Sequence, residues 1–205
     1  MPKLSKKTYH HGDLREALIQ AAIELLPIKG ASGLSLREVA KAAGVSHTAP
    51  YRHFKDKAAL LTAIAQTGFE LLMGHMAQVV ENHKDDPRQQ LIAVATAYVD
   101  LGLKNPELMN LMFGGILDPD TLSEEYCGTS DKAFDGLLEI IIAGQEAGVF
   151  KQENPKIIAV TAWSLVHGLM MLITAGHMRE VATSPEQIEQ LSRTMAENLI
   201  TGILK

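Results

Sequence analysis

Apolar residues recur along the chain at spacings of three and four positions, which is the period of an amphipathic helix. A first stripe runs through Leu14, Leu18 and Leu25, and no segment shows convincing strand alternation. The sequence therefore predicts an all-α protein. About nine helices are expected, over 13–29, 35–43, 47–54, 57 to the low 80s, 87–103, a shorter segment from 105, 131–148, 155–176 and 184–204, with 114–130 the least regular stretch.

Polar residues and glycines mark several of these helix ends. Ser35 is followed three residues later by Glu38, the pattern of a capping box at a helix start. Lys29-Gly30 places a cation in the last turn of the first helix and a glycine just beyond it. Asp56 can cap the long helix that follows. The predicted helices are therefore joined by short loops.

One apolar segment requires a membrane test. Ile157–Met178 has 22 residues without a formal charge, enough to span a bilayer. Its middle carries Ser164 and His167, and a lone span with a central histidine would need an internal partner. We therefore favour a helix buried on all sides inside a helical protein, or a helix at a subunit interface, over a membrane span.

The cysteine content and the start of the chain bear on its compartment. The single cysteine, Cys127, excludes an internal disulfide framework and fits a reducing environment. No apolar run follows the basic N-terminus, so no signal peptide is visible. We expect a cytoplasmic protein.

Charge is distributed unevenly along the chain. The net charge of −5 argues, as an average, against a nucleic-acid partner. Residues 1–57, called the head below, carry ten basic and five acidic side chains. Residues 58–205, the body, carry nine basic and nineteen acidic ones. This split predicts two domains, 1–57 and 58–205, with a basic binding surface on the first.

Residues 35–57 have the pattern of two short helices joined by a tight turn, a helix-turn-helix. Leu36 and Val39 give the first helix an inward face, Gly44 suits the turn and Ser46 can cap the second helix. Donor, small and flat side chains on the second helix suit contacts with phosphates and base edges. They are His47, Thr48, Ala49, Tyr51, Arg52 and His53, followed by Lys57 at the next helix start. Plain helix packing is the alternative interpretation.

The run from about Tyr9 to Leu61 resembles the DNA-binding domain of the TetR family of bacterial transcriptional repressors. The residues that carry the resemblance are YHHGDLREALIQAAIELLPIKG and LSLREVAKAAGVSHTAPYRHFKDKAALL. A second, local similarity lies in the body, where Trp163, His167 and Gly168 look like the Trp-His-Gly signature of one C-terminal domain subclass. The resemblance implies an all-helical body behind the head.

The resemblance also implies residue roles. Ser35 and Arg37 stand where family members touch phosphate, and in the case of Arg37 sometimes a base. The base-reading start of the recognition helix falls on His47, Thr48 and Ala49, and phosphate contacts fall on Tyr51, His53 and Lys57. Ser46 and Arg52 complete the candidate DNA-binding set. Each of His47 and His53 is either a base reader or a solvated or phosphate-facing side chain. Pro50 departs from the usual aliphatic residue, and in a first turn it is expected to cost little. Lys3, Lys6 and Lys7 form either a minor-groove arm or a disordered tail.

The body offers no catalytic or metal-binding motif, so neither an enzyme nor a cofactor or metal site is expected. It is rich in methionine and aromatic residues, which suit an adaptable apolar pocket but also serve as ordinary core. Trp163 and His167 lie four apart on one helix face, either at a pocket or as a satisfied core pair. The candidate ligand contacts are Met73, Met109, Met112, Phe113, Phe134, Trp163, His167 and Met170.

The last two predicted helices are the expected dimer interface, because their apolar stripes need cover and family members pair them into a four-helix bundle. The candidate residues are Ile157, Val160, Leu169, Leu172, Ile188, Leu191, Met195 and Leu199. We therefore expect a homodimeric repressor that binds an inverted-repeat operator in double-stranded DNA and is released by a small, largely apolar effector. The alternatives are an activator, an all-α dimeric ligand-binding module without sequence-specific DNA binding, and a small helical enzyme.

Overall fold

The computed structural model describes residues 11–182 and 184–203 and is all-α within those ranges. Eight α-helices and two short 3₁₀ helices make up this part of the chain. In chain order they are α1 (His11–Gly33), α2 (Leu36–Ala42), η1 (Pro50–Arg52), α3 (Lys57–Glu81), α4 (Pro87–Lys104), α5 (Pro106–Phe113), η2 (Pro119–Thr121), α6 (Glu124–Glu146), α7 (Pro155–Thr174) and α8 (Pro185–Ile203). The predicted fold class is confirmed. The N-terminal lysines proposed as a DNA arm lie outside the described residues.

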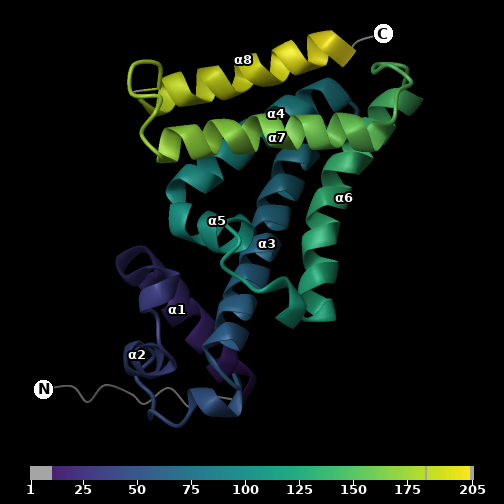
Figure 1. Cartoon of the computed structure of the whole chain (residues 1–205). Coiled ribbons are helices and arrows are strands. Elements are labelled where there is room, and N and C mark those ends of the chain that lie inside the picture. Colours follow the sequence, from purple (N-terminus) through teal and green to yellow (C-terminus); the bar gives the residue numbers. More distant parts are fainter. Residues whose placement is uncertain (1–10, 183, 204–205) are drawn as a thin grey trace, which may run out of the picture.

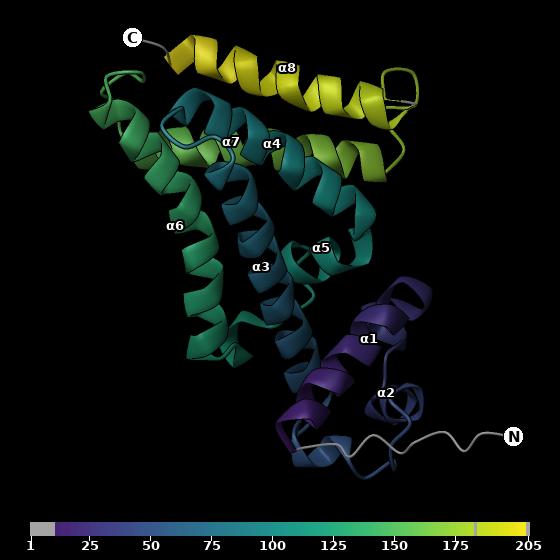
Figure 2. The same ribbon diagram turned by 180° about the vertical axis from the view of Figure 1, so that it is seen from behind.

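The head and the body lie at opposite ends of the molecule. Figure 1 shows α1 and α2 at one end and α7 and α8 side by side at the other, and the reverse view in Figure 2 shows the same arrangement. Helix α3 connects them: it packs on α1 near its start and on α4, α5 and α6 further along. One continuous apolar core runs from Leu18 in α1 to Ile203 in α8. Head and body are thus joined by an uninterrupted helix and a shared core.

The predicted helix starts at Ser35 and Asp56 are confirmed by their caps. The Glu38 amide donates to Ser35 Oγ at 3.2 Å, and the Ala59 amide donates to Asp56 Oδ1 at 2.8 Å. Each bond satisfies a backbone N–H that has no partner inside its helix. At the end of the first helix, Gly30 leaves the helical region with φ 64 and ψ 167, a conformation that glycine adopts without strain. The expected stop at Gly30 is therefore correct, and a further helical turn follows it.

Helix α6 begins earlier than predicted. Its first residue is Glu124 rather than Asp131, because Ser123 supplies a cap whose Oγ accepts from the Tyr126 amide at 3.1 Å. Glu124 in the first turn adds a favourable interaction with the helix dipole. The prediction for this segment was wrong because the glycines and acids of the stretch were interpreted as irregular structure.

The predicted second helix of the helix-turn-helix is also wrong in type. Only the 3₁₀ helix Pro50–Arg52 forms in the range 47–54. Ser46 is four residues before Pro50, so the first bond of an α-helix would need a Pro50 N–H that does not exist. The Ala49 amide bonds to the Ser46 carbonyl instead, at 3.0 Å, which is the tighter i to i−3 spacing. The proline therefore shapes the start of this segment, contrary to the expectation of a small cost.

Helix α7 is only partly covered by its own chain. It packs on α4, α6 and α8, yet Ile157, Val160, Met171 and Leu172 are 65%, 49%, 44% and 47% exposed. The sequence left two interpretations besides a membrane span: burial on all sides inside the protein, or a place at a subunit interface. Burial on all sides within one chain is wrong for this helix. Among the described residues it is the one helix whose length and apolar composition would allow a membrane crossing.

Candidate nucleic-acid interface and internal cavity

The head presents a compact helix-turn-helix. Leu36 and Val39 are buried, and Gly44 in the turn has φ +69, as expected for glycine. Phe54, also buried, follows η1 and lies under the Arg15 guanidinium, which is 5.7 Å from the ring centroid. These contacts hold η1 against α1 and α2. The polar side chains of the turn and of η1 face solvent.

The side chains assigned to DNA lie on α2, the turn, η1 and the start of α3. Six of them are exposed: Arg37, Ser46, His47, Thr48, Tyr51 and Arg52. The other four are half-buried: Ser35, Ala49, His53 and Lys57. Ser46 Oγ and Thr48 Oγ1 share a hydrogen bond of 3.2 Å at the start of the recognition segment. The six exposed side chains are accessible at the surface of the head.

Two of the predicted phosphate contacts already have structural partners. The Lys57 ammonium donates to the Ser32 carbonyl and so ties the start of α3 to the end of α1. Ser35 Oγ accepts from the Glu38 amide and donates to the Glu38 carboxylate at 3.0 Å. Lys29 also bonds to Glu38, at 2.9 Å, and together with Ser35 holds the pKa of this carboxyl below its usual value. Ser35 and Lys57, both half-buried, therefore have structural partners within the head.

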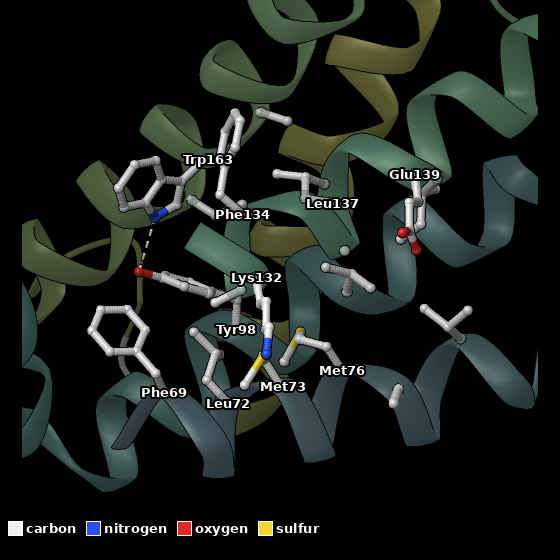
Figure 3. A pocket seen from close by; sticks show the side chains of 18 of the residues that line it. Phe69, Leu72, Met73, Met76, Tyr98, Lys132, Phe134, Leu137, Glu139 and Trp163 are labelled. Carbon is white, nitrogen blue, oxygen red and sulfur yellow. Dashed lines mark hydrogen bonds between the residues drawn. The ribbon is translucent and has the colours of Figure 1, made fainter. Parts of the chain in front are cut away.

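The body contains an internal cavity of about 980 Å³. Its wall is formed by α3, α4, α5, α6 and α7. Figure 3 shows lining side chains from α3, α4, α6 and α7. Apolar side chains dominate the wall, among them Phe69, Leu72, Val94, Leu137 and Ile140. A cavity of this size and composition can enclose a drug-sized apolar molecule.

The structure separates the candidate ligand contacts into two groups. Met73, Met112, Phe113, Phe134 and Trp163 line the cavity, whereas Met109, His167 and Met170 do not. Met109 and Met170 are buried against Gly102 of α4, where a Cβ would lie 2.1 Å from Met170 Sδ and 3.4 Å from Met109 Cε. These two methionines fill the core where α4, α5 and α7 meet. They were predicted as ligand contacts, but they are core residues and do not line the cavity.

Sequence reasoning missed much of the wall contributed by α3. Phe69, Leu72, Met76 and Val80 line the cavity beside Met73. Their spacing of three and four residues places them on one helix face with Met73. This periodicity was visible in the sequence, but it could not show that the face borders a cavity rather than packed side chains.

A hydrogen-bonded group closes one part of the wall. Trp163 Nε1 donates to the Tyr98 hydroxyl at 3.2 Å (Figure 3). The same hydroxyl lies 2.9 Å from His167 Nδ1. An indole N–H can only donate, so the Tyr98 hydroxyl accepts from Trp163. In the bond to His167 Nδ1 the hydroxyl donates or accepts according to the tautomer of the imidazole. Tyr98 and Trp163 face the cavity, and His167 stands behind them.

Burial sets the protonation states in this group. Desolvation raises the pKa of Tyr98 to about 12, partly offset by the Trp163 hydrogen bond. Desolvation also lowers the pKa of His167 below its usual value. Both groups are therefore neutral at physiological pH, and the network is uncharged.

The candidate dimer residues also divide. Ile157, Val160 and Leu172 are exposed on α7, whereas Leu169 is buried in the core of its own chain at 3% exposure. Leu169 is thus corrected to a core residue. On α8, the half-buried side chains that pack partly on the core are Ile188, Leu191, Met195 and Leu199.

No group of three or more metal-ligating side chains occurs within the described ranges 11–182 and 184–203. Cys127 is exposed on α6. The described part of the chain therefore offers an exposed polar head and an apolar cavity as its two distinctive sites.

Two family sequence models match this chain. The model described as "Bacterial regulatory proteins, tetR family" matches residues 18–64, which include the helix-turn-helix. The model described as "Tetracyclin repressor-like, C-terminal domain" matches residues 91–199, more than half of the chain. Trp163, His167 and Gly168 fall inside the second range.

Curated relatives match over part of their length. The nucleoid occlusion factor SlmA of Vibrio campbellii is 31% identical over 114 residues, which are 55% of this chain and 56% of SlmA. The tetracycline repressor protein class C of Escherichia coli is 50% identical over 52 residues, 25% of this chain and 24% of that repressor. The matched segments thus span about half or less of these relatives.

Solved structures match over nearly the whole chain. A protein of unknown function from Rhodococcus sp. RHA1 has a TM-score of 0.86 at 32% identity, covering 98% of this chain and 100% of that one. FadR of Bacillus subtilis, solved with stearoyl-CoA, has a TM-score of 0.73 at 17% identity, covering 92% and 98%, and shares the fold. The two family models and this architecture together establish that the chain belongs to the TetR family of bacterial regulatory proteins.

Proposed function

We propose that the chain is a repressor that binds a palindromic operator as a homodimer and is released by a small, largely apolar ligand in the body cavity. Residues 1–57 form the DNA-binding domain in this proposal, and residues 58–205 form the ligand-binding and dimerisation domain. The observation that carries it is a shared wall: α3 and α5 line the cavity, and both pack on α1 of the head. A ligand that displaces either helix therefore acts directly on the DNA-binding domain.

The proposed signal path has two branches. Along α3, Phe69 on the cavity wall and Lys57 at the head belong to one continuous helix. Through α5, Met112 and Phe113 line the cavity while the helix itself contacts α1. Coupling between two such sites is typically about 1–3 kcal/mol, which lowers operator affinity between about fivefold and 150-fold.

The exposed apolar stripe of α7 supports the homodimer. Two-fold pairing of α7 and α8 with their copies would cover Ile157, Val160 and Leu172 and place two heads on one side of the assembly. Two recognition segments about 34–36 Å apart would meet successive major-groove faces, which predicts an inverted-repeat operator. Analytical ultracentrifugation tests this step, since Val160→Asp with Leu172→Asp is expected to yield monomers.

A mobility-shift assay tests the function as a whole. The DNA that flanks the chain's own gene is the first probe, titrated with full-length protein at two salt concentrations. The expected result is salt-sensitive binding to an inverted repeat, since phosphate contacts release counterions. Absence of binding to any inverted repeat there would favour a ligand-binding module without operator recognition. A DNA-binding regulator of this kind is expected in the cytoplasm.

A further inference from the structure

The cavity is elongated and differs at its two ends. Its wall on α6 runs from Tyr126 to Ala143, which at 1.5 Å per residue is about 25 Å of helix. On α6, Asp131 and Lys132 lie between the aromatic Tyr126 and Phe134, and Glu139 lies further along the helix, beyond the aromatic side chains. A ligand that fills this space must be long and apolar over most of its length.

The inner end is a chain of aromatic rings. The Phe69 ring lies 5.7 Å from that of Tyr126 and 5.3 Å from that of Phe113. Phe113 in turn contacts Trp163 at 5.6 Å, and Trp163 contacts Phe134 at 6.2 Å. Rings from α3, α5, α6 and α7 therefore form one apolar surface that offers hydrophobic and ring contacts but no formal charge.

Charge is confined to the exposed part of the wall, and it is mainly negative. Glu81, Asp131 and Glu139 are exposed carboxylates that line the cavity, and Lys132 is the one basic side chain among its described lining residues. Lys132 and Glu139 both extend from α6 in Figure 3. Glu81 is also paired with Lys84. We call this exposed, charged part of the wall the rim. Carboxylates outnumber basic side chains at the rim, as they do in the whole body, which carries nine basic and nineteen acidic side chains.

We infer that the effector is a lipophilic cation: an apolar body with an ammonium or similar positive group at one end. This inference rests on the function proposed above and names its ligand class. The apolar body lies along the aromatic chain, and the cation remains at the rim beside Glu139. A carboxylate or an acyl-CoA would bring negative charge to the same carboxylates, with only Lys132 to receive it.

A matched series of ligands tests the sign of the head group. Dodecyltrimethylammonium, dodecanoate and dodecanoyl-CoA have the same alkyl chain and are titrated into full-length protein below their micellar concentrations. Trp163 is the chain's only tryptophan and lines the cavity, so its fluorescence reports occupancy. The cation is expected to bind about tenfold more tightly than dodecanoate at low salt. That preference should shrink at 0.5 M salt, where screening acts over about 4 Å.

Two substitutions separate the rim from the charge of the whole body. Glu139→Gln is expected to weaken cation binding about threefold and to strengthen dodecanoate binding. Glu146→Gln removes the same charge from α6 but does not line the cavity, about 10 Å further along the helix, and should leave both affinities nearly unchanged. Both positions are exposed, so circular dichroism should show intact folding.

Equal or tighter binding of dodecanoate or dodecanoyl-CoA would overturn the inferred cation preference while leaving a ligand-responsive regulator intact. No fluorescence change with any of the three would overturn the ligand class and also count against ligand release. Equal effects of the two glutamate substitutions would assign the preference to the charge of the whole body and overturn the role of the rim.

Discussion

Gly68 of α3 allows Met112 of α5 to pack directly on the backbone of α3. A Cβ at Gly68 would lie 2.5 Å from Met112 Sδ and 3.1 Å from Leu108 Cδ1. Met112 also lines the cavity, and α5 contacts α1 of the head. The close approach of α3 and α5 therefore joins cavity and head by direct packing. A ligand that displaced Met112 would therefore disturb the contact between α5 and α3.

Substitution Gly68→Ala is expected to push α5 away from α3. The added methyl group overpacks the contact and should lower the free energy of unfolding by about 1–3 kcal/mol, as measured by urea denaturation. Operator affinity should change in the same variant, because α5 contacts α1. The second substitution Met112→Ala removes the clashing sulfur and should restore operator affinity. Failure of that rescue would show that α5 does not transmit the change.

Gly136 of α6 lines the cavity, and a Cβ at this position would meet nothing within 4 Å. Gly136→Ala should therefore stabilise the fold by about 0.5–1 kcal/mol through helix propensity. Gly136→Phe should place a ring in the cavity and weaken ligand binding, as measured by Trp163 fluorescence. Gly128→Ala is the matched control, because Gly128 lies on the same helix in open space and does not line the cavity. Equal ligand affinity in Gly136→Phe and the wild type would argue against this cavity as the binding site.

Removal of the Tyr98 hydroxyl should destabilise the body. In Tyr98→Phe, Trp163 Nε1 and His167 Nδ1 both lose their partner, and each unsatisfied polar group costs about 1–3 kcal/mol when buried. Thermal unfolding measures the loss, and the Trp163 emission maximum reports the changed surroundings of the indole. An unchanged melting temperature and emission would mean that solvent replaces both bonds without cost.

The lowered pKa of His167 predicts a specific pH dependence of stability. Above the unfolded value of about 6.5 the imidazole is neutral in both states, so it contributes no slope. Below that value the unfolded chain binds the proton first, so stability falls as pH falls toward the folded pKa. The slope of the unfolding free energy between pH 6.5 and 5 should decrease in His167→Gln. A slope equal to that of the wild type would assign the effect to other groups.

Substitutions in residues 46–53, the recognition segment, should affect operator affinity and base specificity separately. Tyr51→Ala is expected to weaken binding to operator and mutated operator alike, because a phosphate contact carries no base information. His47→Ala or Thr48→Ala should instead change the preference at single base pairs, by about 1–3 kcal/mol for a bidentate contact. Binding to a panel of operator variants at fixed salt measures both effects. Uniform losses for His47 and Thr48 would assign those side chains to phosphate.

The extent of prediction from sequence is clearest at the helix ends. Ser35 and Asp56 start their helices because a side-chain oxygen satisfies a local N–H, and this requires only neighbours in the chain. The same rule would have predicted the early start of α6 at Ser123. The turn at Gly44 was predicted by another local property, the freedom of glycine to adopt a positive φ. Pro50 was misjudged by one local detail: it stands at the first position whose N–H an α-helix needs.

The sequence by itself determined the all-α class, the helix-turn-helix, and the contrast between a basic head and an acidic body. Only the tertiary structure decided which apolar faces border the cavity. Helical periodicity places Met73 and Phe69 on one face, and likewise marks Met170 and Leu169 as apolar, but it does not reveal the facing element. Met170 packs in the core against Gly102, where there is no side chain in its way. The helices around Met73 instead leave a cavity of about 980 Å³ between them. The distinction arises because packing depends on distances between helices, which residues far apart in the chain set together.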